Sequence, residues 1–413
     1  MNTIEIEIYN QENELVGDGP LMSADIIDPS WEDTLCELGS FSFRVLANSP
    51  FRDHLTDIRN HIKIIAYYHD PKVTAYSSTY YDKANVFDGQ ITDTSIILDA
   101  SGIPYIEVRG LSLAAELADV VCHINFSARE YPYTAPRYVV DNFAARYPTK
   151  QWMLTPGCPG QQTTFDVGQL AAYFKISYFE FLVNIADYTR SCFRVEPNRR
   201  IYWINQDYPS CKLHACYLDY YDKDDLPLDT LPIKSLTVGQ VSNTAVSSVF
   251  AQGQGDFWLD HNWDPGSPWR VRNLWGGVVL ENLDTIAAYG EHQVYKKFGS
   301  ATSQEALQRL AQTYLINNSE PQYEYSLEVA NLVPGKCMPG HSIRVDYDGV
   351  DETGRYYSIH RDLVIISIAH TIDSDTKRYV GTLTLSDKVT RVLDNGDIVQ
   401  MLTARLTDAY AVG

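Results

Sequence analysis

The sequence predicts a β-rich α+β protein with several domains, in which two related β-barrel-like domains are accompanied by two smaller α+β insertions. Its 413 residues are 45% hydrophobic, which is enough for more than one packed core. Short segments that alternate apolar with polar residues dominate the chain, as in residues 4–9. Four such segments near the N-terminus are followed, in the same order, by four near the C-terminus.

This internal repeat is the main evidence for two related domains. The first set comprises 41–46, 62–67, 86–92 and 105–110, and the second set comprises 325–330, 343–347, 363–369 and 379–384. The second set looks like the first with shorter loops. A chance coincidence of short strand patterns is the alternative explanation. If the repeat is real, three chains that each carry two wedge-shaped domains could complete a six-part ring.

Helices are predicted at few places. Ser177-x-x-Glu180 has the form of a capping box before an apolar stripe, so a helix is expected to follow it. Thr302-x-x-Glu305 repeats this arrangement and predicts a second helix, rich in Ala and Leu. A weaker pattern predicts a third helix over 137–146.

The predicted domain boundaries follow these patterns. The order is a first β-barrel-like domain (1–117), an α+β domain with the capped helix and a hairpin (118–232), a second β-barrel-like domain in two pieces (233–256 and 320–392), a Trp-rich and helical insertion (257–319) and a C-terminal tail (393–413). The hairpin is expected to turn at 197–199, where Pro, Asn and Arg separate two β-type segments.

The net charge of −20 is unevenly distributed, because no Lys or Arg precedes Arg44 while acidic residues are frequent there. A surface of that sign repels phosphate backbones, so tight or sequence-specific nucleic-acid binding is disfavoured. Ordinary solubility is an equally simple explanation of the acidity. Residues 1–10 lack the basic start and apolar core of a signal peptide, and no apolar run is long enough to cross a bilayer. We therefore expect a soluble protein made in the cytoplasm.

Motifs that carry catalytic or cofactor chemistry are not found in the sequence. The seven cysteines are scattered and odd in number, so we expect reduced and mostly buried thiols. Cys211 and Cys216 lie near His214, but their spacing matches no zinc motif. The segment 252–255 lacks the third glycine of a dinucleotide-binding turn, and 222–225 lacks the glycine of a calcium loop. We predict no catalytic residue, no cofactor and no metal site, and we expect that the protein is not an enzyme.

Several phrases of the sequence resemble the hub proteins at the tail tip of long-tailed phages. These proteins form the trimeric baseplate hub of contractile-tailed phages and the N-terminal hub part of siphophage tail-tip proteins. The similar segments are 38–45, 87–91 with 106–113, 178–205, and 303–345. One departure is visible at Gly340-His341, where the family pattern usually has Gly-Asp.

The resemblance implies a homotrimeric ring in the virion, at the tail tip, assembled in the host cytoplasm. Its implied partners are the distal tail ring and tail tube proteins, a tip fibre or spike protein, and the tape measure protein. Genome ejection and host attachment are the implied roles, with DNA passing through without specific binding and without membrane insertion by this chain. We expect some N-terminal acids to face the channel and repel DNA, namely Glu5, Glu7, Glu12, Glu14 and Asp18.

Two other functions remain open at this level. The 29 tyrosines and the stretch with Trp258, Trp263, Trp269 and Trp275 would suit stacking on sugars, as in a tail-associated receptor- or glycan-binding module. A cell-wall hydrolase or peptidase is the less favoured alternative, and it would require an acid–base pair or a metal site.

Overall fold

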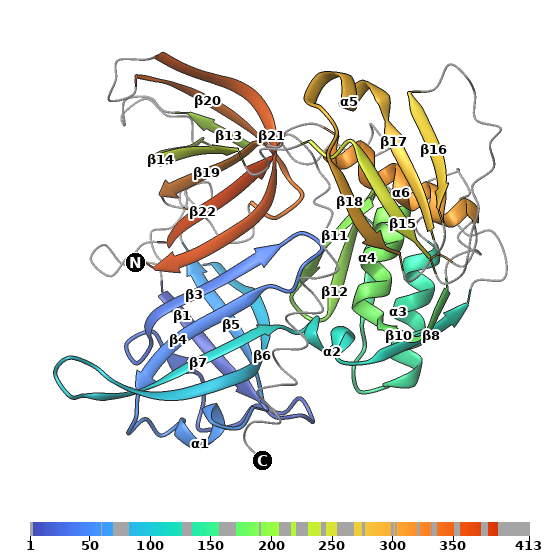
Figure 1. Ribbon diagram of the computed structural model, residues 1–413. Helices are drawn as coiled ribbons and strands as arrows, with labels where there is room; N and C mark the ends of the chain where they lie inside the picture. Colours follow the sequence, from blue (N-terminus) through green and yellow to red (C-terminus); the bar gives the residue numbers. More distant parts are fainter. Residues whose placement is uncertain are drawn as a thin grey trace.

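The computed structural model describes residues 3–58, 60–68, 82–125, 134–156, 171–189, 191–205, 216–219, 230–240, 245–253, 268–274, 277–298, 301, 304–319, 323–330, 332, 337–350, 356–372 and 379–386. Strands dominate these residues and helices are few, so the predicted β-rich α+β class is confirmed. Two β-barrel-like units, which we call the first and second barrel, lie on one side of the molecule, one above the other, and a mixed α/β part lies on the other side (Figure 1).

The first barrel is formed by the N-terminal residues. Its elements are β1 (Thr3–Tyr9), β2 (Leu21–Met22), β3 (Ile27–Thr34), β4 (Ser40–Leu46), α1 (Arg52–Leu55), β5 (His61–Tyr68), β6 (Asp82–Leu98) and β7 (Pro104–Ser112). In β1 the period of two places Ile4, Ile6 and Ile8 in the core, while Glu5 and Glu7 point outward and are half-buried. The strand order is β2-β1-β5-β6-β7-β4-β3.

The second barrel combines strands from distant parts of the chain. Its elements are β13 (Cys216–Asp219), β14 (Thr230–Gln240), β19 (Tyr323–Ala330), β20 (Ser342–Val350), β21 (Tyr356–Ile372) and β22 (Tyr379–Ser386). The order β21-β20-β13-β14-β19-β22 closes on itself, because β22 also pairs with β21. This closure leaves no free edge in the ring of strands.

The two sets of repeated segments have the same strand order. In the first barrel the order is β4-β7-β6-β5, and in the second it is β19-β22-β21-β20, with every neighbouring pair antiparallel. The third strand of each set is 17 residues long. Each of these long strands has a register shift against the fourth strand, between Ile91 and Asp93 and between Ile365 and Ser367. A shared bulge in addition to a shared order is hard to attribute to chance.

The mixed part, which we call the α/β body, consists of the described residues between 113 and 205 and between 245 and 319. Its elements are α2 (Ala115–Ala118), β8 (Val121–Asn125), α3 (Thr134–Arg146), β9 (Met153–Pro156), β10 (Ala171–Ser177), α4 (Tyr178–Thr189), β11 (Ser191–Glu196), β12 (Arg200–Asn205), β15 (Ser248–Gln252), β16 (Trp269–Leu274), β17 (Gly277–Asn282), α5 (Leu283–Tyr289), β18 (Gln293–Lys297) and α6 (Gln304–Asn318). Helix α4 contacts both α3 and α6, and one hydrophobic core joins the three helices to their sheets.

The predicted helices and hairpin can be compared with these elements. The Ser177 hydroxyl accepts a hydrogen bond from the backbone N–H of Glu180 at 3.1 Å, which is the expected cap of α4. Helix α3 begins at Thr134, slightly before the predicted start, and its Pro136 sits in the first turn, where no intrahelical N–H bond is lost. Thr302 lies outside the described residues. The hairpin β11–β12 is confirmed.

Strand pairing also bears on the domain boundaries. Strand β13 lies within 118–232 but pairs with β14 and β20 of the second barrel. Strand β15 lies within 233–256 but pairs with β17 and β18. We therefore propose that β13 and β14 belong to the second barrel and that β15 belongs to the α/β body, which contains both predicted insertions around one core. The predicted tail, 393–413, lies outside the described residues.

Candidate assembly joint between the barrels and the α/β body

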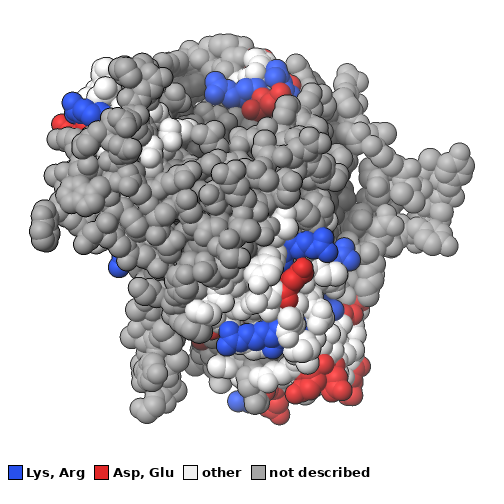
Figure 2. Space-filling model, turned by 90° about the vertical axis from the view of Figure 1, so that its right-hand side faces the viewer, with Lys and Arg blue, Asp and Glu red and all other residues white. Residues whose placement is uncertain are grey.

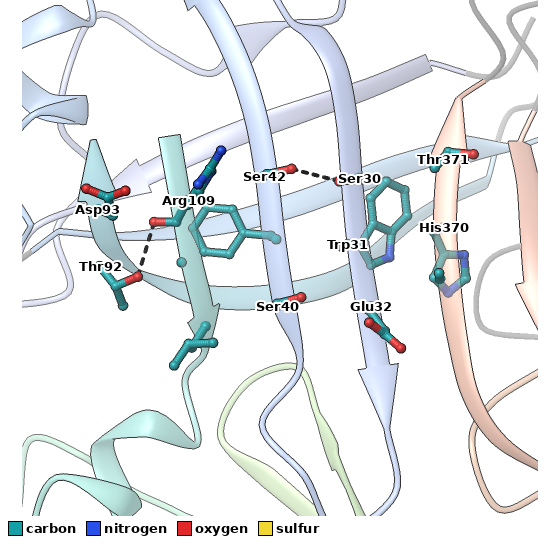
Figure 3. A pocket seen from close by; sticks show the side chains of 14 residues that line it. Ser30, Trp31, Glu32, Ser40, Ser42, Thr92, Asp93, Arg109, His370 and Thr371 are labelled. Atoms are coloured by element: carbon teal, nitrogen blue, oxygen red, sulfur yellow. Dashed lines mark hydrogen bonds between the residues drawn. The ribbon is translucent and has the colours of Figure 1, made fainter. Parts of the chain in front are cut away.

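The two barrels share one continuous sheet. Strand β3 pairs with β4 in its own barrel and with β21 of the second barrel, and we call this second pairing the seam. Trp31 and His370 are direct cross-strand partners in the seam, and their rings stack with centroids 5.0 Å apart and planes 11° apart (Figure 3). Backbone hydrogen bonds and a buried ring pair together fix the angle between the barrels.

The sheet face across the seam contains an open hollow of about 450 Å³. Figure 3 shows that side chains from β6, β7, β4, β3 and β21 line it, with hydroxyl and charged groups among those labelled. The hydroxyls of Ser30 and Ser42 are 2.9 Å apart, and Thr92 donates a 3.5 Å hydrogen bond to the carbonyl of Arg109. The hollow is therefore lined by both polar and apolar groups, and both barrels contribute to it.

Burial keeps the histidine of the seam uncharged. Desolvation lowers the pKa of His370 to about 3, so this imidazole is neutral at ordinary pH. Its Nε2 lies 3.9 Å from the carboxylate of Asp33. Burial raises the pKa of Asp33 to about 7, with the charge of Arg194 acting against the shift and that of Glu32 adding to it.

The end of β3 also meets the α/β body. Beyond the seam, Leu35 donates its backbone N–H to the carbonyl of Ile366 at 3.0 Å. The next residue, Cys36, donates to the carbonyl of Phe193 at 2.8 Å, and its sulfur accepts the N–H of Phe193 at 3.3 Å. Two consecutive residues therefore tie the first barrel to the second barrel and to β11.

Strand β11 is anchored to the second barrel through a buried arginine. The Arg194 guanidinium donates to the carbonyl of Pro339 at 3.2 Å and to the carboxylate of Glu196 at 2.9 and 2.7 Å. It also lies 4.0 Å from the centroid of the Tyr202 ring. The following Gly340 has a φ of +87°, and an added Cβ there would lie 2.4 Å from Ile204. Glycine thus permits the close approach of this loop to β12.

The tip of the β11–β12 hairpin reaches the first barrel, and we call this region the tip contact. Asn198 donates its backbone N–H to the carboxylate of Asp88 at 2.6 Å. Beside this bond, Arg199 donates two hydrogen bonds of 3.0 Å to Glu116 of α2, within the α/β body, and Glu116 also accepts the Trp152 indole N–H at 3.1 Å. Asn198 and Arg199 adopt φ values of +63° and +55° in the tight turn.

Glu116 is the centre of this contact and is only 7% exposed. The ammonium of Lys150 lies 3.3 Å from its carboxylate, in addition to the hydrogen bonds from Arg199 and Trp152. Burial by itself would raise the pKa of this carboxyl, but the hydrogen bonds and charge of Arg199, together with Lys150, outweigh it and hold the pKa below its ordinary value. Glu116 is therefore an ionised, fully engaged acceptor.

The five acidic residues that we expect to face the channel lie in two places, on β1 and in the turn after it. Glu5 and Glu7 lie on the outward face of β1, where Glu5 accepts the Tyr67 hydroxyl at 2.7 Å and Glu7 accepts the Tyr9 hydroxyl at 2.6 Å. Glu12, Glu14 and Asp18 are exposed in the turn that follows β1. Their position relative to a channel stays a prediction.

Other residues singled out in the sequence have separate locations. Cys36, Cys122, Cys192 and Cys337 are buried and not disulfide-bonded, as expected for reduced cysteines. Trp269 is half-buried and packs against the core of the α/β body, while Trp258, Trp263 and Trp275 lie outside the described residues. The segments around Cys211, His214 and 222–225 also lie outside them. Within the described ranges, no three His, Cys, Asp or Glu side chains are grouped so as to hold a metal ion.

The first barrel has an apolar projection. The β6–β7 hairpin extends beyond the body of the barrel, to the left in Figure 1. The exposed fractions of Ile96, Leu98 and Ile103 near its turn are 62%, 68% and 42%. Three large apolar side chains at one protruding end are typical of a surface that is covered in an assembly.

Positive and negative side chains are mixed on the face of the molecule that Figure 2 shows. On the face drawn in Figure 2, the described Lys and Arg side chains lie beside acidic ones and do not gather in one large basic patch. Of the helices in the described part of the chain, none combines the length and apolarity that a membrane span needs.

Known proteins resemble this chain in structure. It is similar to the tail protein from Neisseria meningitidis MC58, with a TM-score of 0.56, 13% sequence identity and coverage of 94% of this chain and 96% of that chain. It is also similar to the 43 kDa tail protein of prophage MuSo2 from Shewanella oneidensis, with a TM-score of 0.53, 12% identity and coverage of 93% and 98%. No protein-family model and no curated protein matches the sequence.

Both similarities extend over nearly the whole of each chain. At such low identity they establish the architecture, and the protein therefore has the fold of phage tail proteins. The resemblance predicted from the sequence phrases is confirmed at this level.

Proposed function

We propose that the protein is a structural component of a phage tail tip, in which three copies close into a hub ring. The ring joins the tail tube and the distal tail ring on one side to the tip, fibre or spike protein on the other. It surrounds the channel through which DNA passes, next to the tape measure protein. In this role the protein acts through assembly in genome ejection and host attachment, and not as an enzyme.

The repeated strand order within one continuous sheet is the observation that carries this proposal. Each chain supplies two similar barrels, and the seam holds them at a fixed angle through direct β3–β21 pairing. Two similar units in a rigid arrangement allow three chains to approximate a six-fold ring. The apolar end of the β6–β7 hairpin is a further feature of a protein that works in an assembly.

The oligomeric state of the purified full chain tests this proposal. We expect light scattering to give three times the chain mass of 46.8 kDa, either for the protein alone or after a tail-tube partner is added. Electron micrographs of the same sample should show a ring with six similar lobes. A protein that stays monomeric at every concentration and with every tail partner, or that forms a stable dimer, would contradict the proposal.

The channel-facing acids give a second prediction. Replacing the exposed Glu12, Glu14 and Asp18 by Lys should leave ring assembly intact but reduce DNA ejection, because lysines attract the phosphates that the acids repel. Glu5 and Glu7 are left unchanged, since tyrosine hydroxyls bind their carboxylates. The defect should shrink at higher salt concentration, where exposed charges are screened.

A matched control reverses three exposed acids of the α/β body, namely Asp141, Asp284 and Glu291. This control protein has the same net charge as the N-terminal variant, and particles that contain it should eject DNA normally. Equal ejection by both variants, or an equal defect in both, would rule out a special position of the N-terminal acids at the channel.

A further inference from the structure

The seam inside the chain uses one particular stretch of β21. Strand β21 pairs with β20 up to Val364, and a register shift follows between Ile365 and Ser367. After this shift, residues 367–371 pair with β3 of the first barrel on the edge that β20 has left, while β22 stays paired on the other edge. The seam is therefore formed by the part of a long strand that extends past its neighbour in its own barrel.

The first barrel contains the same arrangement, but the corresponding edge has no partner among the described strands. Strand β6 pairs with β5 up to Gln90, and its register shift lies between Ile91 and Asp93. The end of the pairing and the position of the shift both match β21 residue for residue, so 93–97 is the counterpart of 367–371. This part of β6 pairs with β7 on one edge, and no described strand pairs with the other, which we call the free edge of β6.

The backbone of β6 presents unpaired hydrogen-bonding groups at this edge. Asp99 donates its N–H to the carbonyl of Ile103 at 3.1 Å, in register with the β6–β7 pairing. Bonded pairs recur at every second residue of an antiparallel ladder. Thr94 and Ile96 lie between the bonded positions, so they direct their N–H and C=O groups away from β7, to the free edge.

The seam shows what such an edge does when a partner is present. The hydrogen bond from Leu35 to Ile366 is in register with the β3–β21 pairing, so the same alternation directs the backbone groups of His370 to its partner Trp31 on β3. His370 is the counterpart of Ile96. The edge that is free in the first barrel is thus the edge that forms the seam in the second.

Strand β3, the other side of the seam, also has a counterpart. It pairs with β4 on one edge and with β21 on the other, and β4 corresponds to β19 in the repeat. The strand that pairs with β19 in this position is β14, again antiparallel. On its other edge β14 pairs with β13 at 230–232, and no described strand pairs with 233–240, which we call the free edge of β14.

We propose that the free edge of β14 in one copy pairs with the free edge of β6 in the next copy, as an antiparallel ladder that repeats the seam between chains. Each free edge is the counterpart of one side of the seam, so the arrangement that joins the two barrels of one chain can also join the second barrel of one copy to the first barrel of the next. Such a contact is head-to-tail, and its repetition can close a ring. This inference rests on the proposed function, because it names the strands through which the copies of the hub ring contact one another.

The repeat also gives the register of this ladder. In the first barrel, successive cross-strand partners lead from Ile91 through β7 and β4 to Trp31. In the second barrel, the same path leads from Ile365, the counterpart of Ile91, through β22 and β19 to Val238. Val238 on β14 is therefore the counterpart of Trp31 on β3.

Pairing in this register involves the apolar end of the β6–β7 hairpin. By analogy with the seam pairs, Ile96 lies opposite Val238 of the next copy, and Ile97 lies opposite Thr237. Ile96 is 62% exposed in the single chain. An unpaired edge with large apolar side chains favours uncontrolled association. A second copy seated at the free edge of β6 removes this liability.

Cysteine cross-linking of the full chain tests both the pairing and its register. Residues between the bonded pairs of an antiparallel ladder have Cα atoms about 4.5 Å apart, within reach of a disulfide. Ile97 and Thr237 take such positions, so I97C/T237C should form a covalent trimer on oxidation, visible on a non-reducing gel. The matched control is I97C/S235C, because Ser235 is exposed as Thr237 is but lies two residues out of register, roughly 7–8 Å away. The covalent trimer should be lost in this control and in each single variant.

Hydrogen exchange of the wild-type ring measures the same ladder without substitutions. The amides of Thr94 and Ile96 should be protected as strongly as those of Ser95 and Ile97, which bond within the chain. At an unpaired edge the amides of Thr94 and Ile96 would exchange faster by at least about tenfold. If I97C/T237C does not fold, this measurement decides alone.

The outcomes distinguish the pairing from the proposed function. A covalent trimer in I97C/T237C that is lost in I97C/S235C supports the pairing. A wild-type trimer in light scattering that gives no such cross-link and no protection at 94 and 96 overturns the pairing and leaves the hub ring standing. Equal cross-linking in both double variants also overturns the pairing, because it shows contact without a register. A chain that stays monomeric, alone and with tail partners, overturns both the pairing and the ring.

Discussion

Replacing Gly110 by alanine should prevent stable folding of the first barrel, with a loss of roughly 3 kcal/mol or more. Gly110 lies in β7 between β4 and β6, and an added Cβ would lie 2.1 Å from the carbonyl oxygen of Gln90 and 2.3 Å from the Phe41 ring. The carbonyl belongs to a neighbouring strand, so relief requires that the sheet itself shifts. The midpoint of urea unfolding, or the yield of soluble protein, measures the effect.

Gly102 provides the matched control for this substitution. It lies in the turn of the β6–β7 hairpin with a φ of +75°, and an added Cβ there would meet nothing within 4 Å. Alanine at this position should cost about 1 kcal/mol, from backbone conformation alone. Equal unfolding midpoints for G110A and G102A would show that the close packing of β7 against β6 is not a determinant of stability.

The sequence predicted the parts of the fold that depend on local patterns. The period of two in 4–9 identified β1, and the capping box at Ser177 identified α4, because both signals come from neighbouring residues. The order of the repeated segments could also be read, since each segment is a complete strand. Strand β13 was not identified, because its four residues carry little pattern and its partners come from 230–240 and 342–350.

The contacts that join the two barrels to each other and to the α/β body, which we call the joint, were not predicted, for a related reason. Its contacts join residues that are far apart in the sequence, such as Asp88 with Asn198 and Arg194 with Pro339. One local signal was available: Glu116 is a single charged residue in the apolar run 113–118. A charge in such a run is rarely buried without partners, so it could have been singled out as the centre of an ionic contact. The identity of the partners, however, required the fold.

The joint also explains how an acidic chain can keep a rigid shape. The seam is stabilised by backbone pairing and by a stacked histidine that is uncharged at ordinary pH. The hairpin tip is held instead by buried ion pairs, in which Arg199 and Lys150 keep Glu116 ionised. The connection between the two barrels therefore depends on backbone pairing, and the position of the hairpin tip depends on buried charge.

Glu116 is the residue at which the stability of the tip contact is best measured. E116Q keeps the size of the side chain and one acceptor for Trp152, but it leaves Arg199 and Lys150 without their counter-charge. Removing one partner of a buried ion pair leaves an uncompensated charge, so we expect a loss of about 3 kcal/mol at neutral pH. The exposed pair of Lys234 and Glu328, at 3.3 Å, provides the control, and E328Q should change stability by less than about 1 kcal/mol.

The same substitution has a characteristic pH dependence. Because the folded protein holds the pKa of Glu116 below its ordinary value, the contribution of this carboxylate is complete above the unfolded value of about 4.5 and is lost as the pH falls through the folded value. The difference in urea midpoint between wild type and E116Q should therefore be large at neutral pH and shrink in strong acid. A constant difference at both pH values, or an E116Q protein as stable as E328Q, would show that Glu116 does not stabilise the tip contact through its charge.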